Sequence, residues 1–193
     1  MDSDNKYLFI VIEGLDGTGK STIAQHLSKE LRGFNYKTPP APFNLFRNII
    51  DKSQNTVTRF LYYLDSVLYA SFEIEKLLEK NHVICDRYYI STLAYHYAID
   101  PELRHYRFER VLDRVIKPDF TFFLKANYHT RIQRMCQREN CDSQMILSDQ
   151  LNHYELTQKI ENEFNKFTEM ITFDTQTLSP QNIIANILSL FRL

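Results

Sequence analysis

The chain has few glycines, few cysteines and no long hydrophobic run. Its 193 residues include only four glycines, so each glycine is expected where the backbone needs a positive φ or lies against a ligand. No apolar run approaches the roughly 18 residues that cross a bilayer, so no membrane partner is expected. The three cysteines form no C-x-x-C pair and are odd in number, which favours a reducing, cytoplasmic compartment.

Neither sign of charge dominates the composition. The 23 lysine and arginine residues face 24 aspartate and glutamate residues, which gives a net charge of −1. A general nucleic-acid binder carries a strong basic excess, so no nucleic-acid partner is expected. Residues 1–6 lead straight into the first predicted strand, which leaves no room for a signal peptide. The length suits one domain, and we predict a single domain over residues 1–193.

Three of the four glycines fall within six residues, at Gly14, Gly17 and Gly19. The stretch that they punctuate has the spacing G-x-x-x-x-G-K-S of a phosphate-binding loop. Backbone N–H groups of such a loop surround phosphates, and the following helix adds the positive end of its dipole. We expect Lys20 to reach the terminal phosphates and Ser21 to give its hydroxyl to Mg²⁺. The residues predicted to bind a nucleoside triphosphate are Gly14, Leu15, Asp16, Gly17, Thr18, Gly19, Lys20, Ser21 and Thr22.

The segments on both sides of the loop are those that the motif requires. Residues 7–12 form a short apolar run with β-branched residues, as in a buried parallel strand. Apolar residues within 21–32 recur on one helical face, and Gly33 follows as a helix stop. A chance match on a surface loop is therefore the weaker interpretation.

Strand-like and helix-like stretches alternate along the rest of the chain. Further strands are predicted at 34–38, 82–86, 120–124 and 170–174, and helices at 43–51, 56–80, 89–98, 102–116, 128–138, 149–167 and from 180 onward. Together with the phosphate loop, this alternation predicts an α/β fold of the P-loop type, with three layers (α/β/α) and a five-stranded parallel sheet. Ligands of such folds bind at the carboxyl ends of the strands.

Asp86 and Arg87 end one of the predicted buried strands. A carboxylate in that place can hold Mg²⁺, directly or through water. An arginine beside it can bind a phosphate through two parallel N–H bonds. Alone, such a pair is weak evidence, because it often caps a strand or forms a surface ion pair. Beside a phosphate loop, the functional interpretation is favoured.

Three segments together resemble thymidylate kinases, a family of P-loop nucleoside monophosphate kinases. They are Phe-Ile-Val-Ile-Glu-Gly-Leu-Asp-Gly-Thr-Gly-Lys-Ser-Thr at 9–22, Asp-Arg-Tyr-x-x-Ser-x-x-Ala-Tyr at 86–95 and Lys-Pro-Asp-Phe-Thr at 117–121. Their order and spacing match from about residue 7 to the final helix. Within the family, the chain most resembles the corresponding domain of the mitochondrial UMP-CMP kinase. The cues are Lys37-Thr38-Pro39-Pro40, Arg47, Arg59 and the stretch from Ala70 to Ile74.

The resemblance implies transfer of the ATP γ-phosphate to a nucleoside 5′-monophosphate, with ATP and Mg²⁺ as cofactors. Because two polyanions meet, this reaction depends on positioning and charge neutralisation more than on covalent help. The cations implied to be catalytic are Lys20, Arg87, Arg134 and Arg138. The side chains implied to bind the acceptor are Glu13, Asp16, Arg47, Tyr62, Arg87 and Tyr95, and those implied to hold the metal are Ser21 and Asp86.

A basic helix face follows the fourth predicted strand. Arg131, Arg134 and Arg138 lie three and four residues apart, so they share one face of a helix. The phosphate loop has Gly17 and Thr18 where some thymidylate kinases carry a catalytic arginine, so the chain resembles the members that supply it from a lid. We predict this lid at about 134–148, with Arg134 and Arg138 nearer to it than Arg131, and expect its closure to exclude water. The alternative is a solvated basic face.

The sequence leaves the identity of the acceptor base open. The family stacks a helix aromatic on the base, and Tyr62 or Tyr63 lies near that position, although a tyrosine on a helix is as often part of the core. Where thymidylate enzymes place a base-reading arginine, this chain has Asp65 or Ser66, and His96 replaces a glutamine that is common in bacterial members. We therefore rank dTMP first as acceptor, with dUMP, UMP, CMP and dCMP as alternatives.

Two other functions and one assembly are compatible with the sequence. A deoxynucleoside kinase would need a general base at the 5′-hydroxyl and no phosphate clamp, and Arg47 and Arg87 argue against it. A regulatory module with little turnover would bind ATP without acceptor-dependent release of ADP. Related kinases are homodimers that pack long helices together, and the apolar run from Phe60 to Leu78 predicts a homodimer here.

Overall fold

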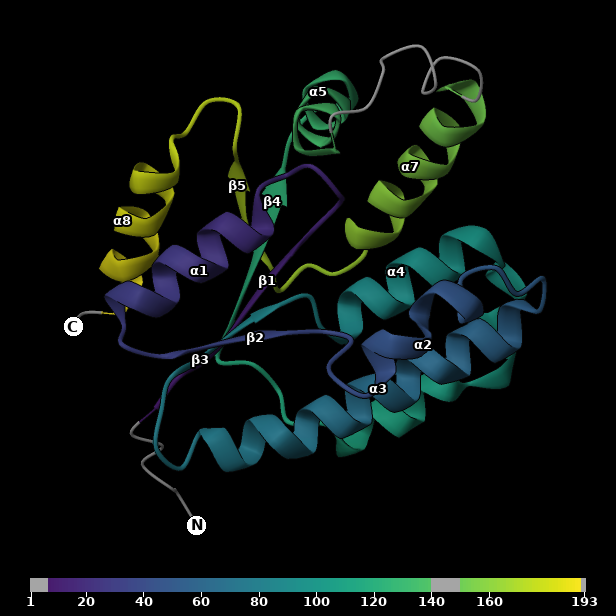
Figure 1. The fold of residues 1–193 in the computed structure, drawn as a ribbon, viewed down its shortest axis with the longest axis horizontal. Coiled ribbons are helices and arrows are strands. Elements are labelled where there is room, and N and C mark those ends of the chain that lie inside the picture. The colour runs from purple at the N-terminus through teal and green to yellow at the C-terminus, as the bar shows by residue number, and fades with distance from the viewer. Residues whose placement is uncertain (1–6, 140–149, 192–193) are drawn as a thin grey trace.

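A five-stranded, fully parallel sheet forms the centre of the computed structural model, which describes residues 7–139 and 150–191 (Figure 1). The strands are β1 (Phe9–Gly14), β2 (Phe34–Lys37), β3 (Val83–Asp86), β4 (Phe120–Lys125) and β5 (Ile171–Asp174), in the spatial order β2-β3-β1-β4-β5. Every neighbouring pair is parallel, so the carboxyl ends of all the strands meet at one edge. This arrangement confirms the predicted α/β fold with its parallel sheet.

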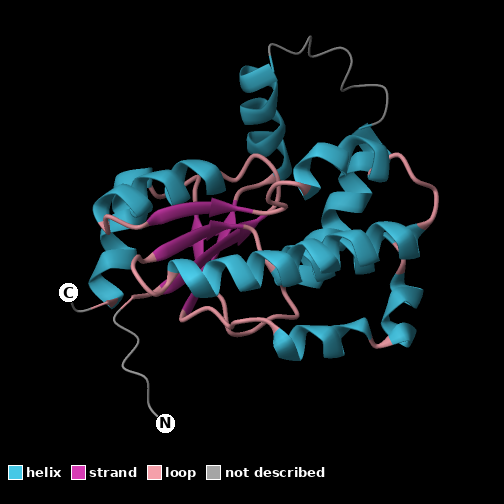
Figure 2. Ribbon diagram, turned by 60° about the horizontal axis from the view of Figure 1, so that its bottom comes forward, coloured by secondary structure: helices cyan, strands magenta, loops and turns pink. Residues whose placement is uncertain are grey.

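Helices cover both faces of the sheet (Figure 2). The α-helices of the described residues are α1 (Lys20–Glu30), α2 (Phe43–Ile50), α3 (Thr56–Leu77), α4 (Tyr89–Ile99), α5 (Tyr128–Glu139), α7 (Gln150–Phe164) and α8 (Pro180–Leu190). The alternation of side chains along β1 builds the two cores. Phe9 and Val11 pack against α3 and α4, whereas Ile10 and Ile12 pack against α1 and α8. Each of these fully buried side chains contributes roughly 1.5–3 kcal/mol of hydrophobic stabilisation, so the central strand is firmly held.

The helix boundaries follow local capping chemistry. The side chain of Asn55 accepts a hydrogen bond from the backbone N–H of Thr58 at 2.9 Å and so starts α3. Ser179 caps α8 in the same way, and Pro180 occupies the first turn, as the sequence predicts. The long helix α3 ends at Leu77, earlier than the predicted residue 80.

Residues 102–116 differ from the predicted single helix. They form two 3₁₀ helices, Pro101–Tyr106 and Phe108–Arg114, which are separated by Arg107 with a φ of 53°. A residue in the left-handed region cannot continue a right-handed helix, so the segment is divided at this point. The two turns still bury Leu103 and Leu112 in the core beside α3 and α4.

Within the part of the chain that the structure describes, no helix has the length and apolar character needed to cross a membrane.

Candidate active site

The phosphate loop connects β1 to α1 at the carboxyl edge of the sheet (Figure 1). Gly17 has a φ of 83°, and a Cβ there would lie 2.5 Å from the carbonyl oxygen of Arg131. Gly14 has a φ of 144°, and a Cβ there would lie 2.6 Å from the carbonyl oxygen of Leu124. A side chain at either position would strain the backbone and collide with a neighbouring element, so only glycine permits this loop shape.

Lys20 is the first residue of α1 and is only 6% exposed. Its Nζ donates a hydrogen bond to the carbonyl oxygen of Leu15 at 2.7 Å, which places the amine inside the loop. Burial, and then the positive charge of Arg87, lowers the pKa of Lys20 to about 7, against the attraction of nearby carboxylates. A cation kept in such surroundings gains most from an anionic ligand, because the ligand would replace its lost hydration.

The exposed Ser21 and the buried Asp86 form an oxygen pair beside the loop. The Ser21 hydroxyl donates to Oδ2 of Asp86 at 2.6 Å, and Asp86 is 3% exposed. The other oxygen, Oδ1, is buried and has no hydrogen-bond partner among the described residues. Buried carboxylate oxygens rarely stay unpaired, and this donor set suits Mg²⁺. Residues 7–139 and 150–191 contain no cluster of three or more His, Cys, Asp or Glu side chains that could hold a metal alone, so a cation here would also need phosphate or water oxygens.

Glu13 fixes the backbone that carries the Asp-Arg pair. Its carboxylate is fully buried and accepts hydrogen bonds from the backbone N–H of Tyr88 at 3.0 Å, the backbone N–H of Ser91 at 3.2 Å and the Ser91 hydroxyl. Burial raises the pKa of Glu13 despite these bonds. Between β3 and these N–H groups lies Arg87, whose φ of 72° is unusual for a residue other than glycine. Glu13 therefore holds the turn that presents Arg87.

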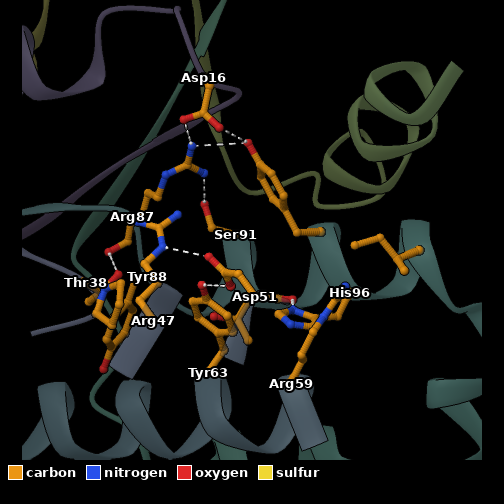
Figure 3. Close-up of a pocket in the computed structure, with 14 residues that line it drawn as sticks. Asp16, Thr38, Arg47, Asp51, Arg59, Tyr63, Arg87, Tyr88, Ser91 and His96 are labelled. Atoms are coloured by element: carbon orange, nitrogen blue, oxygen red, sulfur yellow. Dashed lines mark hydrogen bonds and ion pairs between the residues drawn. The ribbon is translucent and has the colours of Figure 1, made fainter. Parts of the chain in front are cut away.

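Arg87 reaches across to the phosphate loop (Figure 3). Its Nη2 lies 2.6 Å from Oδ1 of Asp16 and 3.2 Å from the hydroxyl of Tyr95, and its Nη1 lies 3.2 Å from Oγ of Ser91. Burial alone would lower the pKa of Arg87, but Tyr95 and Asp16 outweigh it and raise the pKa. Burial likewise opposes ionisation of Asp16, but the charges of Arg87 and Lys20 lower its pKa to about 2. Both groups are therefore charged at neutral pH.

A cavity of about 280 Å³ opens beside Arg87. Its polar lining comes from several elements and includes Asp16, Thr38, Arg47, Asp51, Arg59, Tyr63, Arg87, Ser91, Thr92, Tyr95 and His96. Within it, Asp51 accepts hydrogen bonds from Tyr63 at 2.6 Å and from Arg47 at 3.2 Å. The volume lies just below the usual range for ligand pockets, roughly 300–1,000 Å³, and the lining combines aromatic surface with convergent charges.

The thymidylate kinase family model matches residues 12–187 of the chain. The chain belongs to the thymidylate kinase family. A probable thymidylate kinase of Staphylothermus marinus is 34% identical over 146 residues, which cover 68% of this chain and 70% of that protein. A probable thymidylate kinase of Methanococcus vannielii is 31% identical over 170 residues, which cover 84% of this chain and 78% of that protein. Thymidylate kinases are phosphotransferases that use ATP as phosphate donor, so this chain is an enzyme of that class.

Solved structures of thymidylate kinases share the fold. The thymidylate kinase of Candida albicans superposes with a TM-score of 0.73 at 20% identity, over 96% of this chain and 91% of that one. The enzyme of Ehrlichia chaffeensis superposes with a TM-score of 0.65 at 20% identity, over 96% of this chain and 98% of that one. At this level of identity, the comparison supports the fold alone.

The structure of this thymidylate kinase family member brings four of the predicted acceptor residues, Asp16, Arg47, Arg87 and Tyr95, together at the cavity, whereas Glu13 is fully buried under the Arg87 turn and neither it nor Tyr62 lines the cavity. Tyr62 donates its hydroxyl to the carbonyl oxygen of Phe43, and its neighbour Tyr63 lines the cavity instead. One step along a helix turns a side chain by about 100°, so a shift of one residue decides which tyrosine faces the site. Asp51 was missed by sequence reasoning, although its spacing of four residues from Arg47 on a helix was a usable signal.

Two arginines of the predicted basic face of α5, Arg131 and Arg134, lie against the phosphate loop. Arg134 donates to the hydroxyl and the carbonyl oxygen of Thr175 at 2.9 and 2.8 Å, and its Nη1 lies 3.4 Å from the carbonyl oxygen of Gly17. Arg131 is 2% exposed, and its Nη1 lies 3.4 Å from the carbonyl oxygen of Asp16. Both side chains therefore contact the phosphate loop. The side chain of Arg138 and residues 140–148 of the predicted lid lie outside the described residues.

Proposed function

We propose that this enzyme transfers the γ-phosphate of ATP to the 5′-phosphate of a pyrimidine nucleoside monophosphate, with dTMP as the leading acceptor. The observation that carries the proposal is the pair of cations that flank Asp16, namely Lys20 in the phosphate loop and Arg87 at the cavity. Both cations lower the pKa of Asp16, and Arg87 lowers that of Lys20, so all three charges act on one small region. Two polyanions that exchange a phosphoryl group need cations on both sides.

On the donor side, backbone N–H groups of 14–22 would surround the phosphates, with Lys20 on the terminal ones. Ser21 and Asp86 would hold Mg²⁺, and the unpaired Oδ1 of Asp86 supports this assignment. When bound, the metal neutralises charge on the β- and γ-phosphates. Arg134, held by Thr175, supports the loop from the side of α5.

On the acceptor side, Arg87 and Arg47 would hold the 5′-phosphate, and Tyr63 would lie against the base. An oxygen of the acceptor phosphate attacks the γ-phosphorus, and the bond from that phosphorus to the β,γ-bridging oxygen breaks. ADP leaves with the electron pair of the broken bond. Lys20 and Arg87 would stabilise the charge on the group in transfer, and lid cations such as Arg138 would complete the site.

We also infer that the enzyme is a cytoplasmic homodimer. Leu61, Tyr69 and Phe72 are 43%, 38% and 56% exposed, and their spacing places them on one side of α3. A second copy packed on this side would bury them. The free thiols of Cys85 and Cys136 fit a reducing compartment. Sedimentation velocity tests the assembly: wild type is expected to sediment as a dimer and Phe72→Glu as a monomer, and a monomeric wild type would contradict it.

An acceptor panel tests the proposed reaction. The purified chain is incubated with Mg²⁺ and ATP, and release of ADP is followed with dTMP, dUMP, dCMP, UMP, CMP or thymidine. We expect acceptor-dependent ADP with dTMP at the highest kcat/KM. Turnover with thymidine but not with dTMP would identify a nucleoside kinase. ATP binding without ADP release for any acceptor would identify a nucleotide-binding module, and either result would overturn the proposal.

A further inference from the structure

An imidazole with a fixed hydrogen-bonding direction lines the acceptor cavity. His96, on α4, is 6% exposed and forms part of the cavity wall. Its Nδ1 lies 2.7 Å from the carbonyl oxygen of Thr92, one helical turn earlier. A carbonyl oxygen only accepts hydrogen bonds, so the proton of the ring must reside on Nδ1. Figure 3 shows His96 and Arg59 at the opposite end of the cavity from Asp16.

The second ring nitrogen of His96, Nε2, accepts no hydrogen bond from the described residues. The ring packs between Phe60 and Tyr63, with centroid distances of 5.2 and 5.1 Å. Burial lowers its pKa to about 4, and the nearby charge of Arg59 acts in the same direction, so the ring is neutral at physiological pH. Among the described residues, the ring forms its hydrogen bond through Nδ1. Nε2 does not belong to the fully buried side-chain atoms that lack a hydrogen-bond partner. Nε2 therefore presents a lone pair to the cavity.

The other polar groups at this end have defined directions as well. Arg59 lines the same cavity and can only donate hydrogen bonds. Asp51 is a further acceptor of this cavity, and each of its two oxygens accepts one hydrogen bond, from Tyr63 and from Arg47. The uncommitted polar groups here include one neutral acceptor, His96, and one cationic donor, Arg59, beside the hydroxyl of Thr92, which can donate or accept.

We propose that Nε2 of His96 accepts a hydrogen bond from the N3–H of a thymine or uracil base and so selects these bases over cytosine. This inference rests on the proposed function. Thymine and uracil carry a donor at N3 beside an acceptor at O4, which matches the acceptor and donor pair of His96 and Arg59. Cytosine reverses both, with a lone pair at N3 beside an amino group at C4. It would therefore set lone pair against lone pair and donor against donor, and such mismatches discriminate strongly in buried sites.

Steady-state kinetics of the full chain with dTMP, dUMP and dCMP test this selection. We expect wild type to favour dTMP and dUMP over dCMP in kcat/KM by tenfold or more. His96→Leu removes the acceptor and is expected to reduce that preference about tenfold. His96→Gln, whose amide can present either polarity by rotation, is expected to narrow the preference as well. The matched control is His105→Leu, because His105 is exposed and does not line the cavity; it keeps the wild-type preference.

A substrate analogue gives a second readout, and its wild-type part does not depend on the folding of any variant. N3-methyl-dTMP lacks the N3–H donor, so wild type is expected to use it at least tenfold less well than dTMP, and His96→Leu is expected to discriminate much less. Equal use of dTMP and dCMP by wild type, or an unchanged preference in a folded His96→Leu, would overturn the inference and leave the kinase proposal standing. Failure of wild type to phosphorylate any pyrimidine monophosphate would overturn the proposed function itself.

Discussion

Arg87 and Asp16 join the acceptor cavity to the phosphate loop through a contact of 2.6 Å between Nη2 and Oδ1. The two residues belong to loops that follow neighbouring strands, β3 and β1. Ser91 accepts from the other terminal nitrogen, so the guanidinium is held at both ends of its fork. A fork oriented before binding loses little side-chain entropy when a phosphate arrives, which favours affinity for the acceptor.

Replacement of Arg87 by lysine should separate its geometry from its charge. Lysine keeps one positive charge but loses the planar fork, so the acceptor phosphate would be bound by a single point charge. We expect the KM for dTMP to rise about tenfold or more and kcat to fall by roughly 10²-fold or more, with the KM for ATP near its wild-type value. Arg104→Lys, which changes an ion pair with Glu163 outside the cavity, serves as the control. An unaltered KM for dTMP in Arg87→Lys would remove this residue from the acceptor site.

Lys20 is expected to be required for turnover and to lower the free energy of unfolding near pH 7. Its pKa is about 7 in the folded chain, against an ordinary value of 10.5, so between these pH values the unfolded chain holds a proton that the folded chain lacks. The free energy of unfolding should therefore rise with pH over this window, by at most about 1.4 kcal/mol per pH unit. Lys20→Met should abolish turnover, remove this slope and raise the Tm at pH 7. Urea denaturation at pH 7, 8 and 9 without nucleotide measures the slope, with the exposed Lys29→Met as control. The same slope in Lys20→Met would contradict the prediction.

The fold, the phosphate loop and the position of Arg87 could be predicted because their sequence signals are local. The glycine spacing around Lys20 dictates the loop, and the parallel strands bring that loop and Arg87 to one edge of the sheet. Strand periodicity and short apolar runs were enough to locate all the strands, including the weakly apolar β2.

The lining of the cavity could not be predicted to the same degree, because it depends on the rotation of helices about their axes. Tyr62 and Tyr63 are adjacent in sequence, and only the packing of α3 on α4 decides that Tyr63 faces the cavity. The break at Arg107 has no turn signal of glycine or proline at that residue, so a continuous helix was the natural expectation. The direction of the His96 hydrogen bond likewise depends on a backbone carbonyl that the sequence pattern does not mark.

Removal of the Ser21 hydroxyl should weaken the binding of Mg²⁺ by the enzyme. Ser21→Ala deletes one predicted Mg²⁺ ligand and leaves Oδ2 of Asp86 without its donor at 2.6 Å. We expect the Mg²⁺ concentration for half-maximal activity to rise about tenfold, because a ligand and the orientation of a second are lost together. Activity measured against Mg²⁺ at constant ATP checks this. Ser28→Ala is the matched control, since Ser28 is a hydroxyl of the same helix that bonds only to the carbonyl oxygen of Gln25. A metal profile that Ser21→Ala does not shift would exclude this hydroxyl as a ligand.

The preference between dTMP and dCMP should be insensitive to pH near neutrality. A histidine with an ordinary pKa of 6.5 would gain a proton between about pH 8 and pH 6 and change Nε2 from acceptor to donor. Burial and Arg59 lower the pKa of His96 to about 4, while Asp51 and the Thr92 carbonyl oppose the shift, so the ring stays neutral across that range. The ratio of kcat/KM for the two nucleotides, measured from pH 6 to pH 8, cancels any titration that both substrates share. A constant ratio is expected. A ratio that falls as the pH decreases from 8 to 6 would show that His96 titrates in this window and that its environment in solution is more polar than its burial implies.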